Sequence, residues 1–227
     1  MSMTTHNLSS PRLARLAERP RPGPGPTDQP EHCELCGAEI PGEHRHLADL
    51  DARVLRCACR PCSLLFDRSG AGGGRLRLVP DRRLRLDDFE FSDLAWERLR
   101  IPVDIAFFFR DSSQGRVVAF YPSPMGATES RLELGNWEEV ERVNPVLASM
   151  APDVEALLVN RARGARRQWL VPIDDCYRLV AVIRTRWRGF TGGKEVWQEL
   201  ERFFDDLDRR ARSPTYERRS DGPIRQG

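Results

Sequence analysis

The residues with the clearest chemistry are cysteines, and five of the six in the chain lie between residues 33 and 62. Cys33 and Cys36 form one Cys-x-x-Cys pair, Cys59 and Cys62 form a second, and 22 residues separate the two pairs. Such pairs direct their thiolates at one centre, and four thiolates complete the tetrahedral shell that a structural zinc ion prefers. The spacing therefore predicts a metal site, with zinc as the first choice of metal.

Three other candidate ligands lie close to these pairs in the sequence. Cys57 is two residues before Cys59, and His44 and His46 alternate as they would on a strand or in an extended loop. If Cys57 and Cys59 both bound the metal, a plain pair of knuckles would not describe the site. Iron, an iron–sulfur cluster or a mixed cysteine and histidine site would then be the alternative. A second interpretation of the two histidines is that they cap the loop as polar residues.

The metal site, as predicted, favours a structural role over a catalytic one. A catalytic zinc keeps one position open for water, whereas four thiolates close the shell. Cys176 is the sixth cysteine, and every histidine lies at or before His46, so no base close in sequence would activate its thiol. We expect Cys176 to be a small buried core residue. The sequence therefore favours a protein without enzymatic activity over an enzyme.

The charged residues do not indicate a nucleic-acid-binding protein. The formal net charge is +2, and Lys194 is the only lysine among the basic residues. Residues 31–66 hold more acidic than basic side chains, which makes nucleic acid an unlikely partner for this part of the chain. One expected loop concentrates arginine, with Arg161, Arg163, Arg166 and Arg167. A solvated loop is the plain interpretation, and a surface for an acidic protein partner or RNA is the sharper one.

Composition divides the chain into five segments. Residues 1–30 and 213–227 are polar, and we expect both to be disordered. Residues 31–66 form the cysteine-rich metal-binding element, 67–91 a linker with short strands, and 92–212 an α+β domain. The longest apolar runs reach only strand length and the start lacks a secretory signal, so we expect no membrane span. A reducing cytoplasm is the expected location, since clustered cysteines there bind metal.

Periodicity predicts the elements that must position these residues. Ser92 suits the N-cap of a short helix, and GGKEVWQELERFFDDLDRRA has the apolar stripe of a longer one. We expect an α+β fold with a mostly antiparallel sheet and helices on one face, preceded by a small zinc-ribbon-like knuckle element. The strand-like runs are PVDIAFFF, RVVAFYP, VEALLVNR, RQWLVPID and CYRLVAVIRTRW.

Several phrases of the chain together resemble an uncharacterised actinobacterial family that is encoded in gene clusters of uptake nickel–iron hydrogenases. They are CELCG, HRHLADL, RCACRPC, LVPDRRLRLDDF, IPVDIAFFF, YPSPMGATES, PDVEALLVNR, VPIDDCYRLVAVIRTRW and GFTGGKEVW. The resemblance covers about residues 31–207. It implies no catalytic residue. It implies a role in hydrogenase assembly, maturation or electron transfer, with a hydrogenase subunit or a maturation factor as partner.

The sequence and this resemblance support three hypotheses about function. The first is a non-enzymatic accessory protein of a hydrogenase, with a structural zinc site. The second is an iron-binding or iron–sulfur redox protein that passes electrons to or from the hydrogenase, for which Cys57 is the discriminating residue. The third is a zinc-ribbon regulator that binds nucleic acid, which the acidic metal-binding element disfavours.

Overall fold

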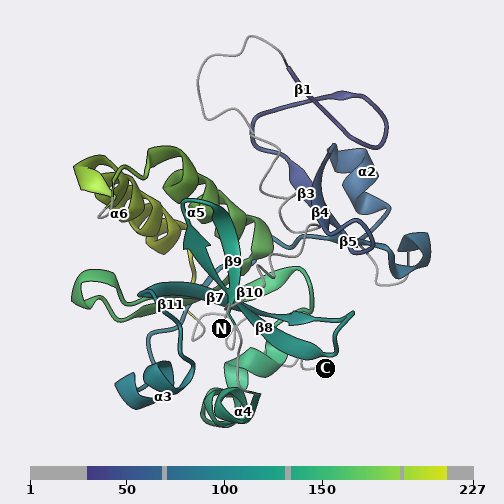
Figure 1. Cartoon of the computed structure of the whole chain (residues 1–227). Helices are drawn as coiled ribbons and strands as arrows, with labels where there is room; N and C mark the ends of the chain where they lie inside the picture. The colour runs from purple at the N-terminus through teal and green to yellow at the C-terminus, as the bar shows by residue number, and fades with distance from the viewer. Residues whose placement is uncertain (1–29, 68–70, 131–133, 190–191, 214–227) are drawn as a thin grey trace, which may run out of the picture.

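The computed structural model describes residues 30–67, 71–130, 134–189 and 192–213. Residues 1–29 and 214–227, which hold nearly all of the two segments that we expected to be disordered, lie outside the described residues. The described chain forms one six-stranded sheet with helices and a smaller unit at one side that contains a three-stranded and a two-stranded sheet (Figure 1).

The six-stranded sheet has the strand order β6-β11-β10-β7-β8-β9, and all of its neighbouring strands are antiparallel. Every residue of β10 is buried, as expected for a central strand that is covered on both faces. The α+β class and the mostly antiparallel sheet are confirmed. The strands are β6 (Leu84–Arg85), β7 (Ile105–Asp111), β8 (Arg116–Ser123), β9 (Gly126–Ser130), β10 (Glu155–Asn160) and β11 (Arg167–Pro172).

Helices cover both faces of this sheet, whereas we expected them on one (Figure 1). One face packs against α5 (Ile173–Arg186) and α6 (Gly193–Arg210). The other face packs against α3 (Asp93–Arg98), α4 (Leu134–Val143) and the short 3-10 helix η2 (Pro145–Ser149). The reason lies in strands such as β7, where Phe107 belongs to the first core and Phe108 to the second. A sheet that is apolar on both sides must bury both.

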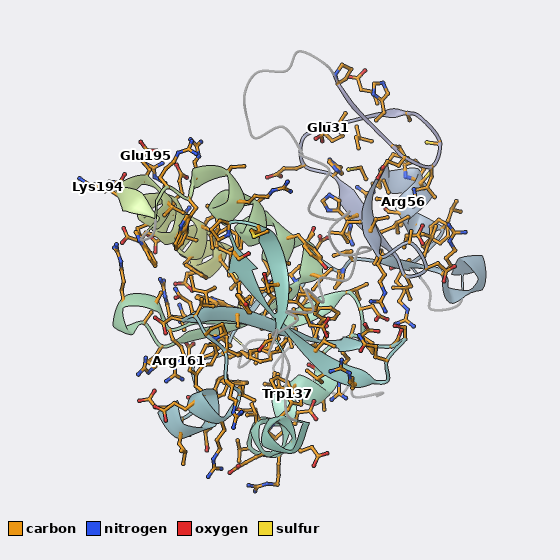
Figure 2. All side chains as sticks on the ribbon, in the orientation of Figure 1. Glu31, Arg56, Trp137, Arg161, Lys194 and Glu195 are labelled. Carbon is orange, nitrogen blue, oxygen red and sulfur yellow. The ribbon has the colours of Figure 1, made fainter. Side chains whose placement is uncertain are left out.

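Figure 2 shows Trp137 on α4, on the side of the sheet opposite α5 and α6. Its ring stacks on Phe108 at a centroid distance of 4.8 Å, which anchors α4 to the second core. Ser92 caps α3 as expected, since its hydroxyl accepts a hydrogen bond from the Ala95 amide at 3.1 Å. The two helices therefore close this face from neighbouring positions.

Helix α5 was expected to be a strand, and that expectation was wrong. The run CYRLVAVIRTRW is rich in β-branched residues, which led to the strand interpretation. In the structure the buried positions recur at intervals of three or four and form one helical stripe on the sheet. Asp174 and Asp175 lie in the first turn, where acidic side chains favour a helix. The buried residues of the stripe include Ile173, Cys176, Leu179, Val180 and Ile183.

The smaller unit is built around the β3–β4 hairpin. Its three-stranded sheet has the order β4-β3-β5 and its two-stranded sheet pairs β1 with β2. We call residues 31–66 together with β5 the metal unit. Its elements are β1 (Glu31–His32), β2 (Glu39–Ile40), β3 (Arg45–Asp49), β4 (Val54–Ala58), α2 (Arg60–Leu64), and β5 (Leu76–Leu78), with the 3-10 helix η1 (Ala71–Gly74) before β5.

The segment expected to be a linker, residues 67–91, contributes strands to both sheets. Strand β5 pairs with β3 in the metal unit, and β6 pairs with β11 at the edge of the large sheet. The edge is extended by Arg212, which follows α6. The Arg85 amide donates to the Arg212 carbonyl at 2.9 Å, and the Arg212 amide donates to the Arg83 carbonyl at 2.9 Å. The segment therefore belongs to both sheets and connects them.

The metal unit shares a core with the α+β domain. Ala48 of β3 and Val79, just after β5, are buried in the same apolar cluster as α5 and α6. Ion pairs support this contact, including Arg77 Nη1 to Asp153 Oδ2 at 2.8 Å and Arg53 Nη2 to Asp111 Oδ2 at 3.6 Å. The β3 side of the metal unit is thus held by the large domain.

The end of β3 carries a buried carboxylate. The side chain of Asp49 is fully buried and accepts hydrogen bonds from Arg56 at 2.7 and 2.9 Å, from Arg75 at 3.2 and 3.3 Å, and from the Ala52 amide at 3.1 Å. Burial raises the pKa of Asp49, but the bonds from Arg75, Ala52 and Arg56 outweigh it and lower the pKa to about 2.

We expect Asp49→Asn to remove an acid-sensitive part of the stability. Because the folded pKa is about 2 and the ordinary value is 3.8, the ionised side chain stabilises the fold fully above about pH 4. The wild type loses this contribution, about 2 kcal/mol, as the pH falls through the folded pKa. Denaturant unfolding between pH 2 and pH 7 measures it, with the exposed Asp51→Asn as control. An Asp49→Asn variant with the wild-type acid slope would contradict the assignment.

Candidate metal centre

The two Cys-x-x-Cys pairs converge in space, as their spacing predicted. The sulfur atoms of Cys33, Cys36, Cys59 and Cys62 all lie within 4.8 Å of one another. The Sγ atoms of Cys36 and Cys59 are 3.7 Å apart. Two thiolates on a tetrahedral zinc ion with bonds of about 2.3 Å would be separated by about 3.8 Å. All six cysteines of the chain are free thiols. These four, the four-cysteine set, could bind a metal ion in a zinc-knuckle-like site.

The first pair sits in a tight turn that follows β1. The Gly37 amide donates to the Cys33 carbonyl at 2.8 Å, and Gly37 has a φ of 75°, a conformation that glycine adopts at little cost. Glu34 fastens this turn to β4 twice. Its amide donates to the Cys57 carbonyl at 2.9 Å, and its carboxylate accepts from the Cys57 amide at 2.8 Å. The turn therefore presents Cys33 and Cys36 from a backbone that β4 holds in place.

The second pair is presented by the start of α2. Cys59 is the N-cap of this helix and Cys62 lies one turn later, so the two sulfurs project from the same side. The Ser63 amide donates to the Cys59 carbonyl at 2.9 Å, which closes the first turn of the helix. A proline lies within the first two positions of α2, where helices tolerate it. Because β4 ends directly before Cys59, the hairpin determines where the second pair lies.

The thiols of the four-cysteine set differ in acidity. Burial raises the pKa of Cys33, but hydrogen bonds from the backbone amides of Cys59, Cys36 and Leu35 outweigh it and lower the pKa to about 6. Hydrogen bonds with the sulfurs of Cys59 and Cys36 raise the pKa of Cys62 to about 12. The set thus favours a thiolate at Cys33 over one at Cys62. Metal binding by four thiolates would release the remaining thiol protons.

Cys57, His44 and His46 form a group of their own, the His–His–Cys group. Their ligand atoms lie within 4.8 Å of one another and do not join the four-cysteine set. The β3–β4 register explains the grouping, because His46 and Cys57 are directly opposite each other. His44 lies two residues before His46, and the two rings meet edge to face at 4.8 Å. The sequence left open whether these residues join one mixed site, and the structure places them in a separate group.

One residue near this group was not predicted from the sequence to be part of a site. Asp174, in the first turn of α5, pairs its Oδ2 with Nδ1 of His46 at 2.8 Å, across 128 positions of the sequence. Burial raises the pKa of Asp174, but the bond and charge of His46 and the charge of Arg83 outweigh it, so the pKa is lowered. The only visible signal was the pair of adjacent acids, Asp174 and Asp175, which a turn explains. That signal says nothing about His46.

The four arginines of the predicted partner surface make contacts within the chain. Arg161 is 6% exposed, donates to the Phe91 carbonyl and pairs with Asp93, so it does not fit a role on an exposed surface (Figure 2). Arg163 stacks on Trp197 at 4.4 Å, and Arg166 pairs with Asp93 at 2.9 Å. Arg167 pairs with Asp208 at 2.9 Å. The four side chains fasten the β10–β11 loop to α3 and α6.

Comparison with known proteins places the chain in a wider group. Residues 32–211 match a family described as "Family of unknown function (DUF5947)". No curated protein matches the chain, and no solved structure matches it. Among the residues that the structure describes, no helix is both long and apolar enough to cross a membrane. The match spans the metal unit and the α+β domain, so both belong to the unit that defines the family.

Proposed function

The chain belongs to the family of unknown function DUF5947, and we propose that it is a non-enzymatic accessory protein with a structural zinc ion in its four-cysteine set. The observation that carries this proposal is the composition of the set, which brings four thiol sulfurs together. Four thiolates fill a tetrahedral shell, so a zinc ion bound there would have no position for a reacting water. Zinc rather than iron is proposed because paired knuckles are its commonest setting.

We place this role in the assembly, maturation or function of a nickel–iron hydrogenase in the cytoplasm. The support is the resemblance of the sequence phrases quoted above to a family of hydrogenase gene clusters. The partner would be a hydrogenase subunit or a maturation factor. The metal unit offers apolar area for such a contact, since Leu64 and Leu65 at the end of α2 are 62% and 67% exposed.

One purification tests both parts of the proposal. The tagged full chain, isolated from its own host without oxygen, is expected to carry zinc, to lack a visible charge-transfer band, and to bring hydrogenase subunits or maturation factors with it. Leu64→Asp and Leu65→Asp are expected to reduce that co-purification at least severalfold. Leu94→Asp is the matched control, because Leu94 is 57% exposed but lies on α3.

Two results would contradict the proposal. Stoichiometric iron with a visible band that Cys36→Ser abolishes would make the four-cysteine set an iron centre and favour the redox hypothesis. Normal hydrogenase activity in a strain that lacks this chain would remove the hydrogenase role. The metal analysis and the hydrogenase test are independent. The metal can therefore be assigned even if the proposed partner is not the true one.

A further inference from the structure

The His–His–Cys group has the chemistry of a metal site distinct from the four-cysteine set. Two imidazoles and one thiol are ligands for zinc and other borderline divalent transition metals, whereas magnesium and calcium prefer oxygen. The three ligand atoms lie within 4.8 Å of one another, close to the separations that a shared ion requires. His46 and Cys57 lie on the β3–β4 hairpin, whose register holds them opposite each other, and His44 lies just before β3. Backbone pairing thus fixes two of the three residues.

The hydrogen bonds of His44 define which of its nitrogens could bind an ion. Nδ1 of His44 lies 2.9 Å from the Pro41 carbonyl and 3.2 Å from the Glu31 carboxylate. Both neighbours are acceptors, so Nδ1 carries the proton and Nε2 of the neutral ring has a lone pair. The side chain of His44 is only 6% exposed, and Nε2 is buried with no hydrogen-bond partner. A buried acceptor of this kind needs an explanation, and a bound cation supplies one.

His46 also has a hydrogen-bond acceptor beside its Nδ1. Its Nδ1 faces the carboxylate of Asp174 at 2.8 Å, which places the proton on Nδ1 and directs Nε2 away from that carboxylate. A histidine that binds a metal usually donates its other N–H to a carboxylate or a carbonyl, which fixes the ring and strengthens the ligand. His44 has a carbonyl and a carboxylate in this role, and His46 has a carboxylate.

The surroundings also suit a cation. Within the described ranges three buried side-chain polar atoms lack a hydrogen-bond partner, and two of them, His44 Nε2 and Asp174 Oδ1, belong to this group and its outer partner. Glu31 and Asp174 bring carboxylates from two different elements, β1 and α5, to the two histidines. Figure 2 shows Glu31 on the arm of the metal unit that carries β1.

We propose that His44 Nε2, His46 Nε2 and Cys57 Sγ bind a second divalent transition-metal ion of the zinc class, with water in the fourth position. This site goes beyond the structural zinc of the proposed function, because three protein ligands leave its shell open. Asp174 is a positioning residue that orients His46 from α5. The metal unit then carries two ions, one in a closed shell of sulfur and one whose shell has a position for water.

Zinc titration of the metal-free full chain, followed by desalting and metal analysis, tests the second site. We expect two zinc equivalents in the wild type and one in either His44→Gln or Cys57→Ala. His32→Gln is the matched control and is expected to keep two, since His32 is an exposed histidine outside the group. Cys36→Ser is expected to keep the ion of the second site. Asp174→Asn is expected to weaken that ion alone, by about 10- to 100-fold.

A measurement on the wild type guards against variants that fail to fold. X-ray absorption of the fully loaded chain is expected to show nitrogen as well as sulfur around zinc, and sulfur alone would overturn the second site. One zinc equivalent that His44→Gln leaves unchanged would also overturn it. So would loss of all zinc in both His44→Gln and Cys36→Ser with β3 and β4 still protected from exchange, because that result indicates one mixed site. A single ion lost in His44→Gln and kept in Cys36→Ser would support the second site and contradict the structural zinc.

Discussion

Replacing Cys36 by serine is expected to release the ion of the four-cysteine set and to disorder the first knuckle and α2, while the six-stranded sheet stays folded. The local apolar core is too small to hold these segments, because its fully buried members are Cys33, Ile40, Leu47 and Ala58. Structural zinc in small domains supplies about 10 to 16 kcal/mol of apparent binding free energy, which becomes folding free energy. Removing one thiolate forfeits much of it.

The disorder should stop at the β3–β4 hairpin. Strand β3 pairs with β5, and Ala48 is buried in the core shared with α5. Hydrogen exchange read by mass spectrometry is expected to show lost protection over residues 31–40 and 59–66 and retained protection over β3 and over β7 to β11. Cys176→Ala is the control, since Cys176 is buried in the core as predicted and lies outside the set. Wild-type protection together with a full zinc content in Cys36→Ser would rule out a stabilising role for the set.

Arg82→Ala is expected to destabilise the α+β domain by about 3 to 5 kcal/mol. Glu155 at the start of β10 is 2% exposed, and Arg82 binds its carboxylate with two nitrogens at 2.7 and 2.9 Å. The Ala151 amide donates to the same carboxylate at 2.8 Å. Removing the arginine leaves a buried carboxylate without its counter-ion, which costs far more than an exposed pair is worth.

A double-mutant cycle separates this penalty from the value of the pair itself. Chemical denaturation of Arg82→Ala, Glu155→Ala and the double variant gives the coupling energy, and the double variant is expected to be less destabilised than the sum of the two. Arg85→Ala is the matched control, because its partner Asp87 is 49% exposed and the loss should stay below about 1 kcal/mol. Equal effects of Arg82→Ala and Arg85→Ala would show that burial of Glu155 does not decide the cost.

Periodicity predicts a helix or strand well where the spacing of apolar residues and their intrinsic preferences agree with the packing in the fold. The stripe of α6 is amphipathic, and Val196, Leu200 and Leu207 are buried as helical spacing requires. Helix α5 was missed because Val180 and Ile183 favour strands intrinsically, whereas packing on the sheet stabilises the helix. Likewise, helices cover both faces because β7 is a continuous apolar run, in which Phe107 enters one core and Phe108 the other.

The candidate metal centre divides in the same way. Local spacing brings Cys33 to Cys36 and Cys59 to Cys62, so the four-cysteine set could be predicted. The separation of Cys57 from this set depends on the β3–β4 register, which the sequence does not reveal. Asp174 reaches His46 only because α5 packs beside the metal unit.

The pairing of β6 with later parts of the chain affects the order in which the chain folds. Leu84 bridges to Arg212 and pairs with Leu170 of β11. Residues near position 84 can therefore pair only after these later parts of the chain have been synthesised. Contacts between residues so far apart in sequence close large loops and form slowly. The two cysteine pairs are only 22 residues apart, so the four-cysteine set closes a short loop and can come together early. The Leu84–Arg212 bridge forms only after residue 212 has been made.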